Sequence, residues 1–263
     1  MLTVITGAGG GMGAETARRF ADEGPMLLCD VSEAKLDALV ATLPGQGHRV
    51  LAGDLADPAV IDRIVTAVAA GGGLRRLVHT AGLSPMMADA RRILDVNLCA
   101  SVRLVDALLP YAGPDSVALL VASIAGHNAG TDRDDDLDDP NATGALDRLA
   151  SGCDPYAGYS YSKRGVMRLA EARAAAWGRR GARIVSISPG LIDTPMNAFE
   201  FDAHPIVAQM LAATPVPRMG TAGEIADAVA YLCSPAASFI TGTDLRVDGG
   251  IVAVMHTDPG FGQ

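Results

Sequence analysis

Short apolar runs alternate with longer amphipathic segments along most of the chain. The apolar runs have the length and composition of buried strands, and they lie at 2–6, 26–30, 48–54, 75–82, 116–123, 182–190 and 244–250. The segments between them repeat apolar residues at helical spacing, as in 60–70 and 89–111. A strand followed by a helix, repeated, gives right-handed crossovers and a parallel sheet covered on both faces. We therefore expect an α/β fold: a single domain over residues 1–263, built on a doubly wound parallel sheet flanked by helices.

One segment, residues 126–155, breaks this alternation. It is polar, it carries the acidic run DRDDDLDD at 132–139, and it is too long for an ordinary connection. Within it, Leu146 and Leu149 follow Pro140 at a spacing that predicts a short helix docked by one apolar stripe. We expect this insertion to cover the mouth of a site at the sheet edge or the adjoining helix, and its aspartates to stay in solvent.

Composition narrows the function classes. The 263 residues are 49% hydrophobic and include 30 glycines, which suits a buried parallel sheet with tight turns. A formal charge of -9 argues against a nucleic-acid binder or a basic membrane-surface helix. The 4 cysteines are scattered, with no Cys-x-x-Cys pair and no histidine cluster, so we expect reduced thiols and no metal site. No basic leader and no apolar stretch long enough to span a bilayer is present, so we expect a soluble, cytoplasmic protein.

A glycine-rich turn links the first expected strand to the first expected helix. Residues Thr6–Gly13 read TGAGGGMG, and we expect a helix to begin near Ala14. Glycines allow the backbone to approach a ligand closely, and a helix N-terminus offers free N–H groups and a positive dipole end to a pyrophosphate. This placement favours a dinucleotide site over a purely structural turn.

The second expected strand ends in Asp30. A carboxylate at that place can accept hydrogen bonds from the ribose hydroxyls of an adenosine. It would repel a 2′-phosphate, and no arginine is adjacent to Asp30 in the sequence, so NAD is favoured over NADP. Two alternatives stay open at this point: a solvated strand end that starts a turn, and a methyltransferase, which places an acid after the second strand of a similar sheet.

The stretch YAGYSYSKRG at 156–165 offers three tyrosines and one lysine. If a helix runs through it, residues four apart share a face, so Tyr159 lies one turn from Lys163. Tyr161 would point to the opposite side, and Tyr156 would lie roughly 10 Å from the lysine by helical rise. Tyr159 is therefore the candidate for joint chemistry with the lysine. The alternative is a surface helix whose lysine stem packs beside a ring.

In this order, the motifs resemble the short-chain dehydrogenase/reductase family over essentially the whole chain. Besides the glycine turn and the Tyr-x-x-x-Lys pair, further pieces fall in family order. Asp54 and Leu55 resemble the adenine-pocket pair, HTAG at 79–82 the Asn-Asn-Ala-Gly motif, Asn97 the helix asparagine, Ser123 the catalytic serine, SPGLIDT at 188–194 the loop around the nicotinamide, and DGG at 248–250 the exit of the last strand. The resemblance implies a Rossmann-type fold and an oxidoreductase, and it leaves little room for the methyltransferase.

The resemblance also implies which residues form the site. Catalytic roles fall to Ser123, Tyr159, Lys163 and Asn97. Cofactor contacts fall to Gly7, Gly11, Met12, Gly13, Asp30, Asp54, Leu55, Ala81, Gly82, Tyr159, Lys163, Pro189, Gly190, Ile192 and Thr194. The insertion, AAAWG at 174–178 and the ending DGGIVAVM resemble the bacterial 3α-hydroxysteroid dehydrogenase/carbonyl reductase branch. One departure is the pair His79-Thr80 in place of two asparagines, which puts the hydrogen bonds between the central strands in doubt.

The chemistry implied is hydride transfer between a secondary alcohol and NAD⁺, which leaves a proton to be accepted near neutral pH. A tyrosinate can accept it if its pKa falls from about 10 toward 7, a change of roughly 4 kcal/mol. One cation about 5 Å away supplies about 3 kcal/mol at an effective dielectric constant near 20, which gives Lys163 a role beside Tyr159. Ser123, at a strand end, can hydrogen-bond the substrate oxygen. By resemblance, Lys163 also contacts the nicotinamide ribose and Asn97 holds a water that passes the proton onward; the alternative for Asn97 is a satisfied kink within its helix.

The segment 191–217 resembles the substrate loop of the family. It offers apolar side chains that suit an apolar substrate, namely Met196, Phe199, Phe201, Ile206 and Met210. We therefore expect an enzyme that uses NAD(H) on an apolar secondary alcohol or ketone, with a hydroxysteroid as one candidate. The alternatives are an NADPH-dependent carbonyl reductase and a non-catalytic dinucleotide-sensing protein.

The expected assembly is a homodimer, with a tetramer as the alternative. In typical members of the family, the tyrosine helix and the long helix before it form a four-helix interface. The insertion obstructs that surface in the resembling branch, and dimers form there through the last helix and the last strand. The corresponding residues here are Glu224 to Cys233 and Leu245 to Asp248.

Overall fold

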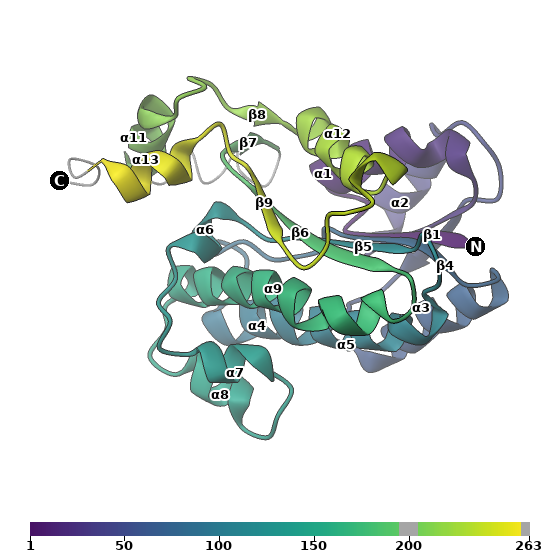
Figure 1. The fold of residues 1–263 in the computed structure, drawn as a ribbon, viewed down its shortest axis with the longest axis horizontal. Helices are drawn as coiled ribbons and strands as arrows, with labels where there is room; N and C mark the ends of the chain where they lie inside the picture. The colour runs from purple at the N-terminus through teal and green to yellow at the C-terminus, as the bar shows by residue number, and fades with distance from the viewer. Residues whose placement is uncertain (195–204, 259–263) are drawn as a thin grey trace.

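A seven-stranded sheet forms the middle layer of the computed structural model, which describes residues 1–194 and 205–258 (Figure 1). Every neighbouring pair of its strands is parallel, and the order is β3-β2-β1-β4-β5-β6-β9. The strands are β1 (Leu2–Thr6), β2 (Met26–Asp30), β3 (Arg49–Ala52), β4 (Leu74–His79), β5 (Val117–Val121), β6 (Arg183–Pro189) and β9 (Asp244–Val247). A separate short pair joins β7 (Ile192–Asp193) to β8 (Gly220–Thr221). The expected doubly wound α/β fold is confirmed.

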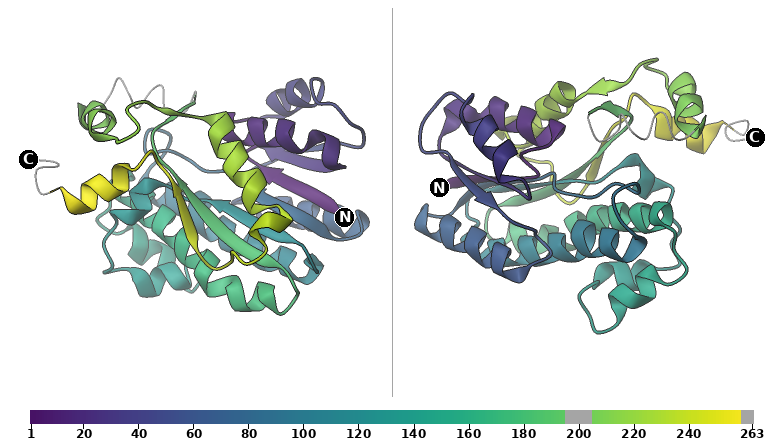
Figure 2. Two further views of the ribbon diagram at one scale, coloured as in Figure 1. Left: turned by 45° about the horizontal axis from the view of Figure 1, so that its top comes forward. Right: turned by 180° about the vertical axis from the view of Figure 1, so that it is seen from behind.

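Helices cover both faces of the sheet (Figures 1 and 2). One face carries α3 (Pro58–Ala70), α4 (Ala90–Leu94), α5 (Ala100–Leu108) and α9 (Pro155–Gly178), and the other carries α1 (Gly11–Phe20), α2 (Glu33–Val40) and α12 (Ala222–Leu232). Side chains alternate between the two faces along each strand. On β6, Ile184 belongs to the core beside α9, whereas Val185 belongs to the core beside α12. This burial on both faces explains why the strands read as continuous apolar runs.

The long helix expected over 89–111 is one continuous rod with an irregular centre. A π-helical turn, η2 (Asp95–Cys99), separates α4 from α5, and a short 3₁₀ turn, η3 (Leu109–Tyr111), ends the rod. The N–H of Ala100 donates to the carbonyl oxygen of Asp95, five residues earlier. Such π turns occur often at functional sites, and this one contains Asn97.

Three short helices form in and just before the insertion, two of which, α7 (Asp134–Asp138) and α8 (Ala145–Ala150), lie at the lower edge of the view in Figure 1. The third is α6 (Ile124–His127), and together they pack against α9 and α4. The short helix expected around Leu146 and Leu149 is confirmed as α8, and Leu149 is fully buried.

The expectation that all the insertion aspartates stay in solvent is wrong. Asp134 forms two hydrogen bonds to Arg164, of 2.6 and 2.7 Å, and one of 2.9 Å to Arg168. Asp138 pairs with the same Arg168, at 2.6 and 2.7 Å. The Arg164 guanidinium holds the pKa of the Asp134 carboxyl below its usual value. The acidic helix α7 therefore docks on arginines of α9, thirty residues away in the sequence.

The rest of the chain forms smaller elements around this frame. They are η1 (Ala21–Glu23), α11 (Pro205–Ala213), η4 (Pro235–Ala237) and α13 (Ile251–Thr257), of which α11 and α13 lie together near the C-terminus in Figure 1. Across 1–194 and 205–258, no helix is both long enough and apolar enough to cross a membrane.

His79 and Thr80 connect β1 to β4 with hydrogen bonds of their own. The Thr80 hydroxyl donates to the carbonyl oxygen of Thr6 at 2.7 Å. The His79 ring lies between two hydroxyls, with Nδ1 2.6 Å from Thr6 Oγ1 and Nε2 2.7 Å from Ser101 Oγ. The central strands are therefore joined by side chains that differ from the asparagine pair of the family.

The direction of these hydrogen bonds follows from the donors present. Ser101 Oγ lies 2.6 Å from the carbonyl oxygen of Asn97, so its single proton must point there. Ser101 then accepts from His79 Nε2–H, and Nδ1 accepts from the Thr6 hydroxyl. Burial, with a smaller effect of the Lys163 charge, lowers the pKa of His79 to about 3, so the ring is neutral at neutral pH.

This neutral histidine makes the fold sensitive to acid. Between pH 6.5 and 3 the unfolded chain binds a proton on His79 that the folded chain does not, so stability falls as pH falls. We predict that His79→Asn loses less stability on going from pH 7.0 to 4.5 than the wild type, by about 2 kcal/mol. Urea unfolding at both pH values measures the difference.

The control for this prediction is His256→Asn, because His256 is exposed on α13. That variant should keep the pH dependence of the wild type. An equal loss of stability in the wild type and in His79→Asn would contradict the prediction.

Candidate functional site

A cleft of about 920 Å³ opens where the parallel strands end. Its walls come from the turns that follow β1, β2, β3, β4, β5 and β6, together with the first turns of α9. The chain leaves β1 and β4 toward opposite faces of the sheet, which creates a crevice at this edge. Every residue expected to contact a cofactor lines this cleft.

The glycine-rich turn lies at one side of the cleft. Helix α1 begins at Gly11, three residues earlier than expected. Its N-cap residue, Gly10, has no side chain to cap the helix, so the N–H groups of the first turn stay available to a ligand. A Cβ on Gly13 would lie 2.2 Å from the carbonyl oxygen of Gly7, which excludes any side chain there. The turn therefore has the bare backbone and the helix dipole that suit a pyrophosphate.

Asp30 is held rigidly at the end of β2. Its Oδ2 accepts from the Gly9 N–H and its Oδ1 from the Ser32 N–H, both at 3.0 Å. The carboxylate thus faces the cleft beside the glycine turn. Lys35 also lines this part of the cleft. The sequence interpretation missed this lysine because it considered only residues adjacent to Asp30 in the sequence.

Asp54 is held by two partners. One carboxylate oxygen accepts from the Ala56 N–H at 2.9 Å, and the other forms an ion pair with Arg92 of α4. Arg92 also approaches Asp95, at 3.6 Å. Arg92 was missed by the sequence interpretation because it lies 38 residues from Asp54, with no local spacing between them.

Ser123 follows β5 and caps α6. Its Oγ accepts from the Ala125 N–H at 3.2 Å, and the side chain lines the cleft. The helix it begins lies against the backbone of α9, since a Cβ on Gly126 would meet Arg164 N at 2.8 Å. This close approach brings Ser123 near the tyrosine helix.

The tyrosines of α9 separate as the helical spacing predicts. Tyr156, Tyr159 and Lys163 line the cleft, whereas the Tyr161 hydroxyl donates to Asp132 of the insertion at 2.8 Å. The Lys163 Nζ lies 5.7 Å from the centre of the Tyr159 ring and donates to the Val121 carbonyl at 2.9 Å. Burial lowers the pKa of Lys163 to about 8, so the ammonium form predominates at pH 7.

Asn97 lies behind the cleft wall, almost fully buried in the π-helical turn. Its Oδ1 accepts from the Leu83 N–H at 2.7 Å, and its Nδ2 donates to the Leu83 carbonyl at 3.0 Å and to Ser162 Oγ at 3.2 Å. The carboxamide therefore ties the loop after β4 to α9. Asn97 contributes position here, and its role in holding a water stays a prediction.

The outer part of the cleft is rich in methionine. Met86 and Met87 come from the loop after β4, Met210 from α11 and Met255 from α13. Of the residues expected in the substrate loop, Met210 lines the cleft and Ile206 is exposed. The expected Met196, Phe199 and Phe201 lie outside the described residues.

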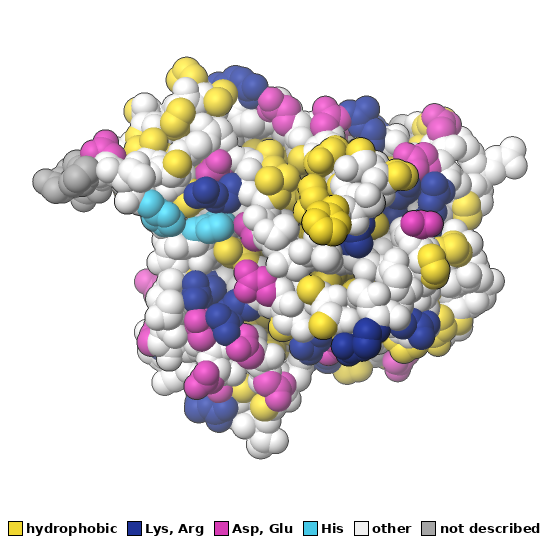
Figure 3. Space-filling view, in the orientation of Figure 1, with side chains coloured by type: hydrophobic (Ala, Val, Ile, Leu, Met, Phe, Trp, Pro, Cys, Tyr) yellow, Lys and Arg dark blue, Asp and Glu magenta, His cyan; other side chains and the backbone are white. Residues whose placement is uncertain are grey.

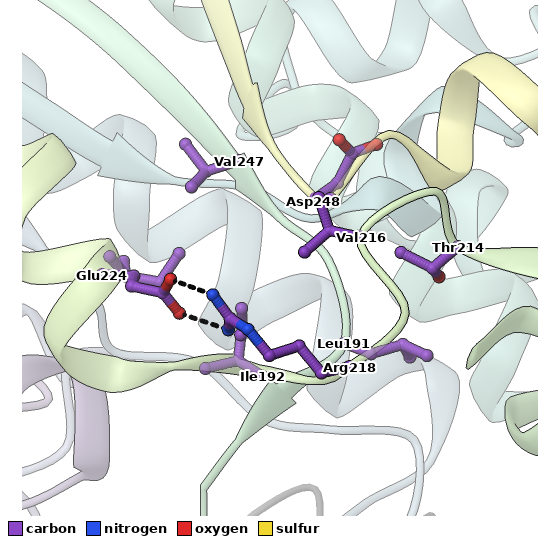
Figure 4. Close-up of a pocket in the computed structure, with 11 residues that line it drawn as sticks. Leu191, Ile192, Thr214, Val216, Arg218, Glu224, Val247 and Asp248 are labelled. Carbon is purple, nitrogen blue, oxygen red and sulfur yellow. Dashed lines mark hydrogen bonds and ion pairs between the residues drawn. The ribbon is translucent and has the colours of Figure 1, made fainter. Parts of the chain in front are cut away.

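A second, smaller cavity of about 190 Å³ lies behind Leu191 and Ile192 (Figure 4). Across it, Arg218 donates to both carboxylate oxygens of Glu224, at 2.7 and 2.9 Å. Glu224 also accepts from the Thr221 N–H at 2.8 Å, which completes a capping box at the start of α12. The pair ties the segment before β8 to α12.

The described parts of the chain contain no set of side chains suited to bind a metal ion. No group of three or more His, Cys, Asp or Glu side chains there is arranged to hold a metal ion. The four cysteines are free thiols.

Comparison with known proteins gives consistent results. The family model described as short chain dehydrogenase matches residues 2–133, and one described as enoyl-(acyl carrier protein) reductase matches residues 145–252. The cis-4-hydroxycyclohexanecarboxylate dehydrogenase of Sinomonas cyclohexanicum is 34% identical and matches over 96% of this chain and 97% of its own. The 3-alpha-hydroxysteroid dehydrogenase/carbonyl reductase of Comamonas testosteroni is 28% identical, with 97% and 98% covered.

The fold matches that of a solved relative equally well. The structure of the 3-alpha-hydroxysteroid dehydrogenase from Pseudomonas sp. B-0831, complexed with NADH, aligns with a TM-score of 0.83 at 27% identity, over 98% of this chain and 99% of that one. With the family model covering half of the sequence and the same cleft at the strand ends, this chain belongs to the short-chain dehydrogenase/reductase family.

Proposed function

We propose that the protein interconverts an apolar secondary alcohol and its ketone with NAD(H), with a hydroxysteroid as one candidate substrate. The observation that carries the proposal is that Ser123, Tyr159 and Lys163 line the same cleft as the glycine-rich turn. The Pseudomonas relative, named as a complex with NADH, supports the choice of cofactor.

The residues of the cleft fit a dinucleotide. The N–H groups in the first turn of α1 suit the pyrophosphate, and the Asp30 carboxylate suits the ribose hydroxyls of the adenosine. The segment Pro189 to Thr194 lines the opposite part of the cleft, where the nicotinamide would lie by family resemblance. When bound, the nicotinamide accepts or donates the hydride.

Three side chains bind the substrate oxygen and transfer its proton. Ser123 hydrogen-bonds the substrate oxygen, and Tyr159 Oη accepts the alcohol proton during oxidation or donates it during reduction. Lys163 stabilises the tyrosinate because its ammonium group lies beside the ring with little water around it. Its pKa of about 8 leaves that charge in place at neutral pH and removes it in more alkaline solution.

Asn97 acts by position in this proposal. It fixes the loop at Leu83 against Ser162, which lies next to Lys163 on α9. Proton transfer onward through a water at Asn97, implied by the family resemblance, remains part of the proposal.

NAD is proposed over NADP because the fixed Asp30 carboxylate would meet a 2′-phosphate as a like charge. Lys35 opposes this effect, since a lysine can pair with a phosphate. The NADPH-dependent carbonyl reductase is therefore the second candidate. A non-catalytic dinucleotide sensor is disfavoured because Ser123, Tyr159 and Lys163 are all present at the cleft.

The first prediction separates the tyrosines. Tyr159→Phe deletes the proposed proton acceptor and keeps the ring, so turnover should fall by about 10³-fold while NADH binding changes little. Tyr161→Phe is the matched control, because its hydroxyl bonds the insertion, and it should be mild. Steady-state kinetics and calorimetric titration with NADH measure both effects, and the reverse order of severity would refute the assignment.

The second prediction concerns cofactor choice. Asp30→Ala should weaken NAD⁺ binding by about 10-fold or more, because a hydrogen bond to a charged group is lost, and should narrow the gap to NADP⁺. Glu33→Ala removes a nearby exposed charge outside the cleft and should change neither affinity. Dissociation constants come from calorimetry, and a wild-type protein that already prefers NADP⁺ would overturn the NAD assignment.

The assembly we propose is a homodimer through α12 and β9. Tyr231, Phe239 and Leu245 are 48, 103 and 39% exposed, and apolar side chains gather over this region in Figure 3. Strand β9 is one of the two edge strands of the sheet. The insertion packs on α9 and α4, the helices that would otherwise meet a neighbour.

We predict that light scattering gives a dimer mass for the wild type and that Phe239→Asp combined with Leu245→Asp gives a monomer. Burying two carboxylates in an apolar interface is strongly unfavourable. Ala69→Asp, on the exposed side of α3, should stay dimeric. A stable tetramer, or an interface formed by α9 against its symmetry mate, would contradict this assembly.

A further inference from the structure

The charges of the cleft lie at its cofactor and catalytic parts. Among the described residues that line it, the charged ones are Asp30, Lys35, Asp54 and Lys163. Asp30 ends β2, Lys35 lies in α2 and Asp54 follows β3, on the side of the cleft where the adenosine would bind. Lys163 is buried beneath Tyr159 with its Nζ on the Val121 carbonyl, so it does not reach the outer part of the cleft.

The outer part is apolar and uncharged. It is lined by the four methionines Met86, Met87, Met210 and Met255 with Tyr156 and Asn128. The Tyr156 hydroxyl approaches Met86 Sδ at 3.4 Å. Thioethers are polarizable and adaptable, and they are weak hydrogen-bond acceptors.

Among the described residues that line this outer part, none is a lysine or an arginine. Arg218 precedes Met219, which lines the cleft, but it faces the second cavity, where both of its terminal nitrogens bind Glu224 (Figure 4). A carboxylate bound among these side chains would give up part of its hydration without gaining an ion pair from the described lining, which is unfavourable.

Asn128 is the polar group best placed to contact the far end of a substrate. Its Nδ2 donates to Met255 Sδ at 3.7 Å, and among the described residues this is the carboxamide's hydrogen bond. A carbonyl or hydroxyl of a ligand is a better acceptor than a thioether and would replace it.

Asn128 is also held at a definite distance from the reacting centre. It ends α6, about 7 Å along the helix axis from Ser123 by helical rise. The preceding His127 binds Asp244 at 3.0 Å, and Asp244 in turn accepts from Ser186 Oγ at 2.6 Å, so the end of α6 is fixed to β9 and β6.

We propose that the outer cleft selects uncharged apolar ketones and secondary alcohols, that it rejects carboxylates, and that Asn128 binds an uncharged polar group at the far end of the substrate. This inference rests on the proposed function and adds the selection against anions. Asn128 is thus a specificity-determining residue.

Three matched ketones test the selection: methyl 4-(4-oxocyclohexyl)benzoate, the corresponding benzoate, and 4-(4-methylphenyl)cyclohexanone. Reduction by NADH gives kcat/KM, and calorimetric titration into the NADH-loaded protein gives affinity. The ester should exceed the carboxylate by about 30-fold in both quantities, since a partly desolvated carboxylate has no cationic partner there. It should exceed the methyl compound by about 5-fold, as expected for one hydrogen bond.

Two variants at Asn128 should each change a different one of these ratios. Asn128→Arg should improve the carboxylate by about 10-fold or more and reduce its disadvantage against the ester. Asn128→Leu should abolish the advantage of the ester over the methyl compound. Ala69→Arg adds the same charge on the exposed side of α3 and should leave every ratio at its wild-type value.

The outcomes separate this inference from the proposed function. If no ketone is reduced but the ester binds more tightly than the carboxylate, the selection stands and the proposed activity falls. The inference is overturned if the carboxylate is reduced or bound with the same efficiency as the ester. It is also overturned if none of the three ketones binds.

Discussion

The junction between β1 and β4 positions both parts of the cleft. Parallel strands that lead to opposite faces of a sheet leave a crevice between their ends, and here the glycine turn follows β1 while the loop held by Asn97 follows β4. The His79 ring fixes this junction from within, between Thr6 and Ser101. The buried ring must be neutral to accept one hydrogen bond and donate the other. The hydrogen bonds that join β1 to β4 and to the helix after the π-helical turn therefore depend on the neutral form of His79.

Lys163 shows how burial and function oppose each other in this site. Removing an ammonium group from water lowers its pKa to about 8, which costs stability in the charged form. The same loss of water strengthens the electrostatic interaction between the Lys163 ammonium group and the side chain of Tyr159, because the local dielectric constant falls. The carbonyl of Val121 offers one hydrogen bond in compensation. A fully exposed lysine at this spacing would keep its charge but would have little effect on the pKa of a neighbouring tyrosine hydroxyl, because water would screen the interaction.

Charged contacts hold the insertion against the rest of the protein. Its acidic helix α7 neutralises arginines on the outer face of α9, and Arg133 packs over the Tyr161 ring and donates to carbonyls at the end of α8. The exposed ion pairs among these contribute little individually. Together they hold the insertion on the helix that carries Tyr159, and they leave α12 and β9 as the uncovered apolar surface.

Local spacing in the sequence was enough for the strands, the layer order and the pairing of Tyr159 with Lys163, because strand and helix periods relate residues within a few positions of each other. The family motifs added Ser123, Asn97 and the residues that line the cleft. The tertiary structure alone decided the partners of Asp54, His79 and the insertion aspartates, and the approach of Asn128 to Met255. These contacts join residues thirty or more positions apart in most cases, or depend on how the short helices dock, and no local period relates such positions.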